Sequence, residues 1–390
     1  MGKYFTRTVI LLSLVSLFTD ISSELLYPVL PFYLQRIGFS VIAIGLLEGV
    51  ANVFIGISTG YFGVWSDRTG DRLKFVRIGY FMSAIGKPLM IFSMHPIWIV
   101  LSRITERLGK GVRTGARDAL LLNETQDGNA GKVFGFHRAM DTAGAVIGPL
   151  LALLYLHFHS GDYKSLFIIA FFPAIIGVLF TLVIKSKKDA GKSTEQFRSA
   201  AIANILYPFK LNKSLRRIFT GLLFFSLFNS ADAYLFLICK LKGLSDESLI
   251  FGYVGYNLIY ALFAMPMGDW SDRFGPRNVF VAGLIFFALA YFIFAVSESI
   301  LGMVIAFALY GISNAGTEGV SKAWLSKHIG HGQKATVFGA LKAITSIGLL
   351  LASAISGWVW IQFSPVAAML LAAIGAIITA GLLVATTSKN

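Results

Sequence analysis

The sequence predicts an all-α integral membrane protein with twelve transmembrane helices in two pseudo-symmetric six-helix bundles. Three observations support this fold class: the composition, a regular series of apolar blocks, and a repeat that relates the two halves of the chain. Of the 390 residues, 56% are hydrophobic and 14% are charged, and the mean hydropathy is +0.71. An ordinary soluble domain carries roughly a quarter charged residues, so a soluble globular protein is excluded.

The apolar blocks give the number of spans and the division of the chain. A helix that crosses a bilayer needs about 20 mostly apolar residues, and polar or charged turns separate twelve such blocks. The longest polar interval splits them six and six. We therefore expect an N-terminal bundle at residues 1–185, a basic cytoplasmic linker at 186–215 and a C-terminal bundle at 216–390. The expected spans are 7–35, 41–65, 75–95, 97–119, 132–157, 165–185, 216–240, 247–269, 278–297, 299–323, 335–361 and 364–386.

The charge of the chain indicates its surroundings and its orientation. Lys and Arg total 34 against 20 Asp and Glu, a formal net charge of +14, which fits either nucleic acid or a membrane protein with basic inner loops. The high hydropathy decides for the lipid bilayer, so we expect no nucleic-acid partner. Most loop Lys and Arg fall on one side, and the positive-inside rule then predicts a multi-pass protein of the cytoplasmic (inner) membrane with both termini cytoplasmic.

A repeat at a shift of about 205 residues relates the two halves of the chain. The segment 63–72 reads Gly-Val-Trp-Ser-Asp-Arg-Thr-Gly-Asp-Arg, and 268–277 reads Gly-Asp-Trp-Ser-Asp-Arg-Phe-Gly-Pro-Arg. Because three pairs of segments match at nearly one offset, we infer an internal duplication. The two further pairs are 133–139 with 337–343 and 109–113 with 314–318.

The Gly-x-x-x-Asp-Arg-x-Gly-x-Arg loop in both halves, the six-plus-six spans and the basic central loop resemble the major facilitator superfamily (MFS) of secondary transporters along essentially the whole chain. The resemblance implies two bundles that rock around a central cavity lined by helices one, four, seven and ten. It also implies a small-molecule substrate, and many transporters of this kind work as monomers. The sequence contains no P-loop and no recognisable set of nucleophile, base and orienter. We therefore expect neither ATP-driven transport nor an enzyme, and no cofactor.

The duplicated loop is expected to latch the cytoplasmic side of the transporter. Its two glycines allow a tight turn, and its two aspartates lie near helix ends with arginines close by. Two arginines near the cytoplasmic mouth of helix four are expected to pair with Asp67 and Asp118 as part of the same gate. The residues assigned to this cytoplasmic gate are Gly63, Asp67, Arg68, Gly70, Arg72, Arg113, Arg117, Asp272, Arg273, Gly275 and Arg277.

Two carboxylates on the first helix are candidates for coupling transport to an ion. Asp20 and Glu24 are four residues apart and therefore lie on one helix face. Two carboxyl groups held so closely disfavour double ionisation, so one of them can keep and exchange a proton. A charge at bilayer depth costs about 2.5–3.5 kcal/mol or more, which makes such residues functional candidates. The alternatives are a cation site or a structural pair with an arginine of helix four.

Helix four carries a basic stripe, because five cationic residues recur at spacings of three or four. Arg103 and Arg107 lie deepest in the membrane, and an arginine fork suits carboxylate or phosphate, so they favour a substrate with an anionic group. The alternative is that these two arginines pair with Asp20, Glu24 or Glu48. The stripe consists of Arg103, Arg107, Lys110, Arg113 and Arg117.

The second half contributes polar and acidic residues on its predicted cavity helices. The first half is basic on balance and the second acidic, which suits a zwitterionic or mixed-charge solute, although both signs are also explained by internal pairs. Tyr256 belongs to an aromatic stripe that core packing explains equally well. The predicted substrate-binding residues are Tyr27, Glu48, Arg103, Arg107, Asn229, Asp232, Tyr234, Tyr256, Tyr310, Asn314 and Glu318.

Helix five carries the segment Gly144-Ala-Val-Ile-Gly148-Pro149. It is similar to the Gly-x-x-x-Gly-Pro signature that the superfamily associates with exporters that exchange solute for protons. The alternative is close helix packing, because small residues four apart let two helices approach and proline bends one of them. On the same helix, Arg138 and Asp141 are three residues apart and are expected to neutralise each other.

Together these observations predict a secondary active transporter that moves a small anionic or zwitterionic organic solute by alternating access, with proton coupling and a slight preference for export. The alternatives are an importer of an anionic nutrient or metal chelate, a metal-ion transporter, and a non-transporting membrane receptor. The six histidines form no cluster typical of a metal site. The one cysteine cannot form an intrachain disulfide or a multi-cysteine metal site, so we expect no bound metal.

Overall fold

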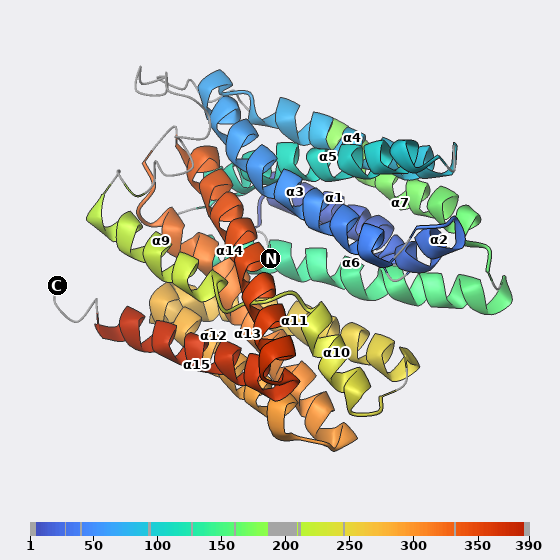
Figure 1. Cartoon of the computed structure of the whole chain (residues 1–390). Helices are drawn as coiled ribbons and strands as arrows, with labels where there is room; N and C mark the ends of the chain where they lie inside the picture. Colours follow the sequence, from blue (N-terminus) through green and yellow to red (C-terminus); the bar gives the residue numbers. More distant parts are fainter. Residues whose placement is uncertain are drawn as a thin grey trace. The chain divides into compact units, whose positions relative to one another are not determined.

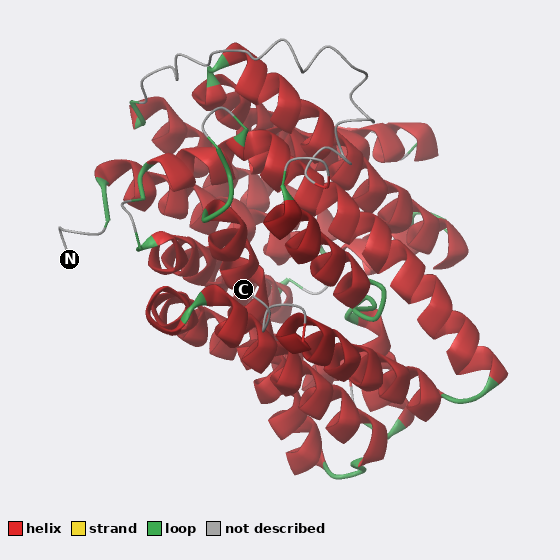
Figure 2. Ribbon diagram, turned by 90° about the vertical axis from the view of Figure 1, so that its left-hand side faces the viewer, coloured by secondary structure: helices red, strands yellow, loops and turns green. Residues whose placement is uncertain are grey.

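The computed structural model of the chain is built of helices throughout the part that it describes (Figure 2). The all-helical fold predicted from the sequence is confirmed for these residues. The predicted linker, residues 186–215, lies outside them apart from Phe209 and residues 212–215. The described residues are 5–27, 29–39, 41–92, 95–125, 128–159, 161–185, 209, 212–244, 246–330 and 333–385.

Helices follow one another through both halves with short connections. In the first half they are α1 Arg7–Leu26, α2 Leu30–Arg36, α3 Val41–Thr69, α4 Arg72–Phe92, α5 Pro96–Asn123, α6 Ala130–Phe158 and α7 Tyr163–Val183. In the second half they are α9 Lys213–Ser226, α10 Ala233–Leu241, α11 Asp246–Phe274, α12 Pro276–Val296, α13 Ile300–Ser326, α14 Lys334–Gln362 and α15 Pro365–Ala385.

Eight of the helices are long and apolar enough to cross a membrane, when the described residues are searched. They are α1, α4, α6, α7, α12, α13, α14 and α15. α5 is 28 residues long, but it carries the basic stripe, and these charges lower its mean hydropathy.

Two of the predicted spans are divided helices. The span expected at 7–35 consists of α1 and α2, and the span expected at 216–240 consists of α9 and α10. Pro28 follows α1 and has no backbone N–H with which to continue a helix. Residues 227–232 separate α9 from α10, and the side chain of Asn229 in this segment can compete for backbone hydrogen bonds. The two breaks occupy corresponding positions in the two halves.

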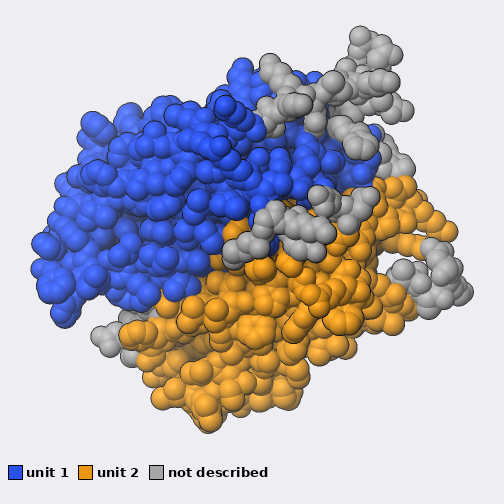
Figure 3. Space-filling model, turned by 180° about the vertical axis from the view of Figure 1, so that it is seen from behind, with its two compact units in different colours: residues 1–126, 140–208, 329–343 blue, residues 127–139, 209–328, 344–390 orange. Residues whose placement is uncertain are grey.

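The chain divides into two compact units (Figure 3). The first turns of α6 belong to unit 2, and the first turns of α14 belong to unit 1. Packing therefore assigns these two helix starts differently from a division by span order. Unit 1 comprises residues 1–126, 140–208 and 329–343, and unit 2 comprises residues 127–139, 209–328 and 344–390.

The same helix pairs pack together in both units (Figure 1). In unit 1, α4 packs against α5 and α7, α3 packs against α5, and α1 packs against α7. In unit 2, α12 packs against α13 and α15, α11 packs against α13, and α9 packs against α15. Each pair in unit 2 corresponds to a pair in unit 1 by order along the chain. The repeat in the sequence is therefore also a repeat in the packing.

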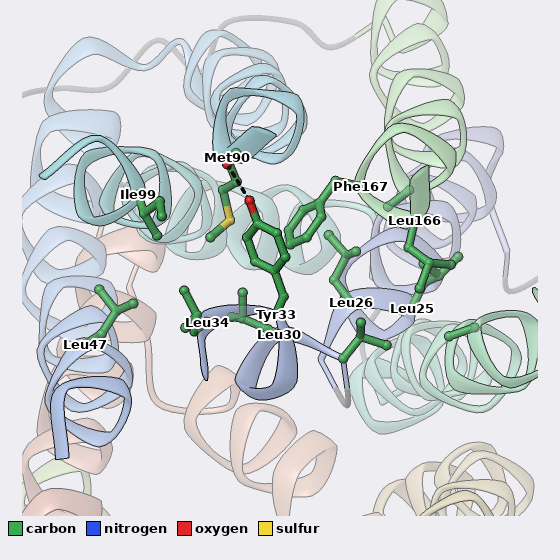
Figure 4. Packing of buried hydrophobic residues seen from close by; sticks show 13 residues of the cluster. Leu25, Leu26, Leu30, Tyr33, Leu34, Leu47, Met90, Ile99, Leu166 and Phe167 are labelled. Carbon is green, nitrogen blue, oxygen red and sulfur yellow. Dashed lines mark hydrogen bonds between the residues drawn. The ribbon is translucent and has the colours of Figure 1, made fainter. Parts of the chain in front are cut away.

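Buried apolar residues hold the short α2 within unit 1 (Figure 4). The Tyr33 side chain is nearly inaccessible, and its hydroxyl donates to the carbonyl oxygen of Met90 of α4 at 3.4 Å. Its ring centroid lies 5.0 Å from that of Phe167 of α7. Leu30 and Leu34 are also buried. Although α2 has only 7 residues, side chains of α4 and α7 fix its position.

Candidate functional site

The loop between α3 and α4 holds a buried ion pair. Gly70 has a φ of +66°, a left-handed conformation that suits glycine. This turn lets Arg72, at the start of α4, reach back to the end of α3, where its Nη2 lies 3.0 Å from Oδ1 of Asp67. Both side chains are buried, whereas Arg68 is exposed. The spacing of the repeated loop predicts this Asp-Arg contact.

The same carboxylate caps the N-terminus of α14 within unit 1. Asp67 Oδ1 accepts from the backbone N–H of Ala335 at 3.2 Å, and Oδ2 accepts from the backbone N–H and the hydroxyl of Thr336 at 2.7 and 2.9 Å. The first N–H groups of a helix lack intrahelical partners and carry partial positive charge, so a carboxylate there is stabilising. A Cβ at Gly63 would lie 2.5 Å from the carbonyl oxygen of Ala335, so this approach needs glycine.

The second copy of the loop caps α6 in the same way within unit 2. Asp272 Oδ1 accepts from the backbone N–H of Gly131 at 2.8 Å, and Oδ2 accepts from that of Lys132 at 2.7 Å. A Cβ at Gly268 would lie 2.1 Å from the carbonyl oxygen of Gly131. Gly275 turns the chain with a φ of +87°. Sequence reasoning missed both caps, because each helix start lies far from its loop in the chain.

The arginines of the two loops have different partners. Arg277 is the counterpart of Arg72, but it donates to the carbonyl oxygen of Val384, near the end of α15, at 2.8 Å. Arg273 lies 2.8 Å from Asp269, one turn earlier on α11. The repeat in sequence therefore preserves the helix cap and not the ion pair.

Two arginines of α5 have firm partners in unit 1. Arg117 donates from Nε and Nη2 to Oδ1 of Asp118, both at 3.1 Å, which confirms one predicted pair. Arg113 donates to the hydroxyl of Ser83 at 2.5 Å, and its guanidinium lies 4.2 Å from the ring centroid of Tyr80. Arg113 thus contacts α4 rather than the loop carboxylate that the sequence suggests.

A buried group of three charges joins α4 to α5 in unit 1. Arg103 binds Glu106, three residues later on α5, and Nζ of Lys87 on α4 lies 3.9 Å from Oε1 of Glu106. All three side chains are at most 8% exposed. A Cβ at Gly86 would lie 2.8 Å from Cβ of Glu106, so glycine lets the two helices approach. The predicted partners of Arg103 did not include Glu106, although the spacing of three residues on a helix indicates it.

Two carboxyl groups meet where α1 faces α6 in unit 1. A Cβ added at Gly144, one turn after Asp141 on α6, would lie 2.9 Å from Cβ of Asp20. Ser16, one turn before Asp20, donates to Oδ1 of Asp141 at 2.5 Å. Asp141 is buried. Sequence reasoning assigned Asp141 to Arg138 and so missed its contact with α1.

The glycines of α6 explain how this helix approaches α1. A Cβ at Gly144 would lie 2.6 Å from the carbonyl oxygen of Leu17, and a Cβ at Gly148 would lie 2.7 Å from that of Ile21. Pro149 lies inside α6. The packing interpretation of the Gly-x-x-x-Gly-Pro segment therefore has a direct structural basis.

The other predicted residues of the first half lie in varied surroundings. Arg107 is half-buried on α5, and Tyr27, at the end of α1, is exposed. Glu48 lies within α3, but its side chain lies outside the described part of the structure. Among the described residues, no group of three or more His, Cys, Asp and Glu side chains could hold a metal ion.

The break between α9 and α10 carries an acid in unit 2. Asp232 stands immediately before α10, and its Oδ1 accepts from the hydroxyl of Tyr310 at 2.6 Å. Its Oδ2 accepts from the hydroxyl of Tyr256 at 3.2 Å. The ring centroids of these two buried tyrosines are 5.4 Å apart, and that of Tyr291 lies 6.1 Å from that of Tyr310. Three predicted substrate-binding residues are thus brought together.

The remaining predicted residues of the second half lie around this break and along α13. Asn229 lies in the break, and the hydroxyl of Tyr234 donates to the carbonyl oxygen of Ser353 of α14 at 2.7 Å. On α13, Glu318 lies one turn after Asn314. Within unit 2, Glu318 pairs with Arg138 from the first turns of α6, at 2.5 Å, and Arg138 also binds the hydroxyl of Tyr260.

Comparison with known proteins gives the family. The sequence profile of the Major Facilitator Superfamily matches residues 12–256 and 242–389. The chain belongs to this superfamily. This MFS transporter is 33% identical over 385 residues to an uncharacterised MFS-type transporter of Methanocaldococcus jannaschii, with 98% of this chain and 95% of that protein covered. It is 24% identical over 298 residues to the multidrug resistance protein MdtG of Escherichia fergusonii, with 73% of this chain and 70% of that protein covered.

Solved structures confirm the MFS fold. The crystal structure of the human organic anion transporter MFSD10 (TETRAN) matches with a TM-score of 0.82 at 15% identity and covers 97% of this chain and 99% of that one. The Escherichia coli fucose:proton symporter FucP matches with a TM-score of 0.78 at 13% identity and covers 98% of both chains. The predicted resemblance and the twelve-span, membrane-spanning fold are thereby confirmed.

Proposed function

We propose that this MFS transporter is a secondary active carrier that moves a small anionic or zwitterionic organic solute by alternating access and couples its movement to protons. The breaks at corresponding positions of the two halves are the observation that carries the proposal. In secondary transporters, interrupted helices in equivalent positions of internal repeats hold the substrate and the coupling ion. Here one break follows Asp20 and Glu24, and the other contains Asn229 and Asp232.

Charged residues of each unit support a substrate with charged groups. In unit 1, Arg107 lies one turn beyond Arg103 on α5 and offers a guanidinium that binds carboxylate or phosphate well. We assign the anion contact to the guanidinium of Arg107, with Arg103 one turn earlier on the same helix. In unit 2, Asp232 and its two tyrosines offer a negative charge held in an aromatic setting, which suits an ammonium group.

Direction and gating complete the proposal. The Gly-x-x-x-Gly-Pro segment of α6 resembles the exporter signature, so we propose export from the cytoplasm in exchange for protons. We place both termini on the cytoplasmic side of the inner membrane and propose that the protein works as a monomer. The two capped loops, with Asp67 and Asp272, are proposed to hold the cytoplasmic gate, since each binds the start of a helix from another part of the chain.

Thermal stabilisation of the purified protein tests the substrate class. We expect a carboxylate, phosphate or zwitterion from a mixed panel to raise the melting temperature, and Arg107→Ala to abolish the effect. Asp232→Asn is the matched variant on the other unit and should weaken the response to zwitterions only. Stabilisation by cations or metal chelates alone, unchanged in Arg107→Ala, would contradict an anionic organic substrate. It would favour a transporter of metal ions or metal chelates.

Flux in proteoliposomes tests the coupling and the direction. A solute found in the panel is loaded, and its movement is followed under an imposed pH gradient of either sign. Proton exchange predicts that acidification of the opposite side drives efflux and that Asp20→Asn abolishes this effect. Equal flux under both gradients would contradict proton coupling, and a protein that binds the solute without moving it would be a receptor.

A further inference from the structure

At Gly144, α6 approaches α1 beside two carboxyl groups. A Cβ at Gly144 would lie 2.6 Å from the carbonyl oxygen of Leu17 and 2.9 Å from Cβ of Asp20, so only glycine allows this approach. Asp141 precedes Gly144 by three residues and therefore lies on the same face of α6. The backbone geometry of the two helices thus places Asp141 opposite Asp20 within unit 1.

The position of these carboxyl groups favours a proton between them. Ser16, one turn before Asp20, binds Asp141, and Gly144, one turn after Asp141, lies against Asp20. Two carboxyl groups at one helix contact disfavour double ionisation, and a protonated carboxyl can donate to an ionised one. Ser16 donates to Oδ1 of Asp141, and the Nη1 of Arg117 lies 3.4 Å from the Ser16 hydroxyl oxygen. The pair is held by directed contacts from α1 and α5 as well as by the helix packing.

Other charges surround the pair, and two of the cations have further partners of their own. Arg117 binds Asp118, and Arg113 is held by Ser83 and the Tyr80 ring. α7 also packs against α1, and its titratable residues, Tyr163 and Lys164, lie in its first turn. The charged groups that act on Asp20 or Asp141 are Glu24 of α1, Lys87 of α4, and Lys110, Arg113 and Arg117 of α5. Tyr80 of α4 and Arg103, Glu106 and Asp118 of α5 act in turn on these cations.

We propose that Asp20 and Asp141 share one proton, and that this inter-helix pair, rather than Asp20 with Glu24, is the proton-binding site of the transporter. The inference rests on the proposed proton coupling and names the residues that perform it. When the proton leaves, two carboxylates remain in contact and repel each other, so the contact of α1 with α6 depends on proton occupancy. Gly144 is a positioning residue, because it sets the distance between the two carboxyl groups.

Infrared spectroscopy of the purified full-length protein tests the pair without a substrate. At neutral pH the wild type should show the carbonyl stretch of a protonated carboxyl group that exchanges in heavy water. Asp20→Asn and Asp141→Asn should each remove this band, because the asparagine amide donates the hydrogen bond to the remaining carboxylate and no shared proton is needed. Glu24→Gln is the matched control and should keep the band.

The possible outcomes test the shared-proton pair separately from proton-coupled transport. A band that survives in Asp141→Asn, or that disappears in Glu24→Gln, would overturn the assignment. Gly144→Ala should weaken the band while helix content by circular dichroism stays unchanged, and an unaltered band would refute the positioning role. If the band behaves as expected but solute flux ignores the pH gradient, the proposed proton-coupled transport fails and the shared-proton site stands.

Discussion

The two copies of the repeated loop show which part of a duplicated motif is kept when its surroundings change. Asp67 and Asp272 each cap the first turn of a helix with both carboxylate oxygens. Arg72 binds its aspartate in a buried pair, whereas Arg277 binds the carbonyl oxygen of Val384. The helix cap is therefore the common role of the two loops, whereas the partner of the loop arginine differs between the two units.

The largest difference between the loops should appear when the aspartates are removed. Asp67→Ala removes the cap of α14 and leaves Arg72 buried without its carboxylate, which typically costs about 3–5 kcal/mol. Asp272→Ala removes only the cap of α6, which typically costs about 0.5–2 kcal/mol. Unfolding in detergent measures both, with the exposed Arg68→Ala as a near-neutral control. An equal or larger loss for Asp272→Ala would show that the buried pair adds nothing to the cap.

The glycines that face the capped helices should give an intermediate effect. Gly63→Ala and Gly268→Ala would place Cβ atoms 2.5 and 2.1 Å from backbone carbonyl oxygens. Overpacking of this kind costs about 1–3 kcal/mol, and we expect the larger loss of melting temperature for Gly268→Ala. Gly255→Ala on α11 is the matched control, because no atom lies within 4 Å of its added Cβ. If the control variant loses as much stability, helix contact is not the cause.

The smallest effect concerns the residues that cap α7 and α15, which occupy equivalent places in the two halves. Asp162 caps α7, and donated hydrogen bonds from Ser165 and Tyr155 hold its pKa below the usual value. Because the folded pKa is lowered, this contribution to stability is present above the ordinary aspartate pKa and is lost as the pH falls through the folded pKa. Ser364 caps α15 without an ionisable group.

A pH series of melting temperatures checks this difference. The wild type should lose slightly more stability on acidification than Asp162→Asn, which keeps the cap and removes the titrating group. Ser364→Ala should lower stability by about 0.5–2 kcal/mol to the same extent at every pH. Identical pH profiles for the wild type and Asp162→Asn would contradict the role of the Asp162 carboxylate.

The sequence predicts the spans well because apolarity is a property of each segment alone. It does not predict the breaks as reliably: Pro28 is a visible signal, but residues 227–232 stay within an apolar block although their helix is interrupted. The Asp67 and Arg72 contact follows from spacing within one loop. Contacts such as Asp20 with Asp141 depend on how distant helices pack, and no local pattern contains that information.

The buried group of Lys87, Arg103 and Glu106 limits how these three positions can change during evolution. Loss of Glu106 alone would leave two buried cations without their carboxylate, and loss of either cation would change the charge that the others experience. A single substitution at any of the three is therefore costly, while a joint replacement by apolar residues is not. Among descendants of this sequence, the three positions should change together, and their covariation would mark the contact of α4 with α5.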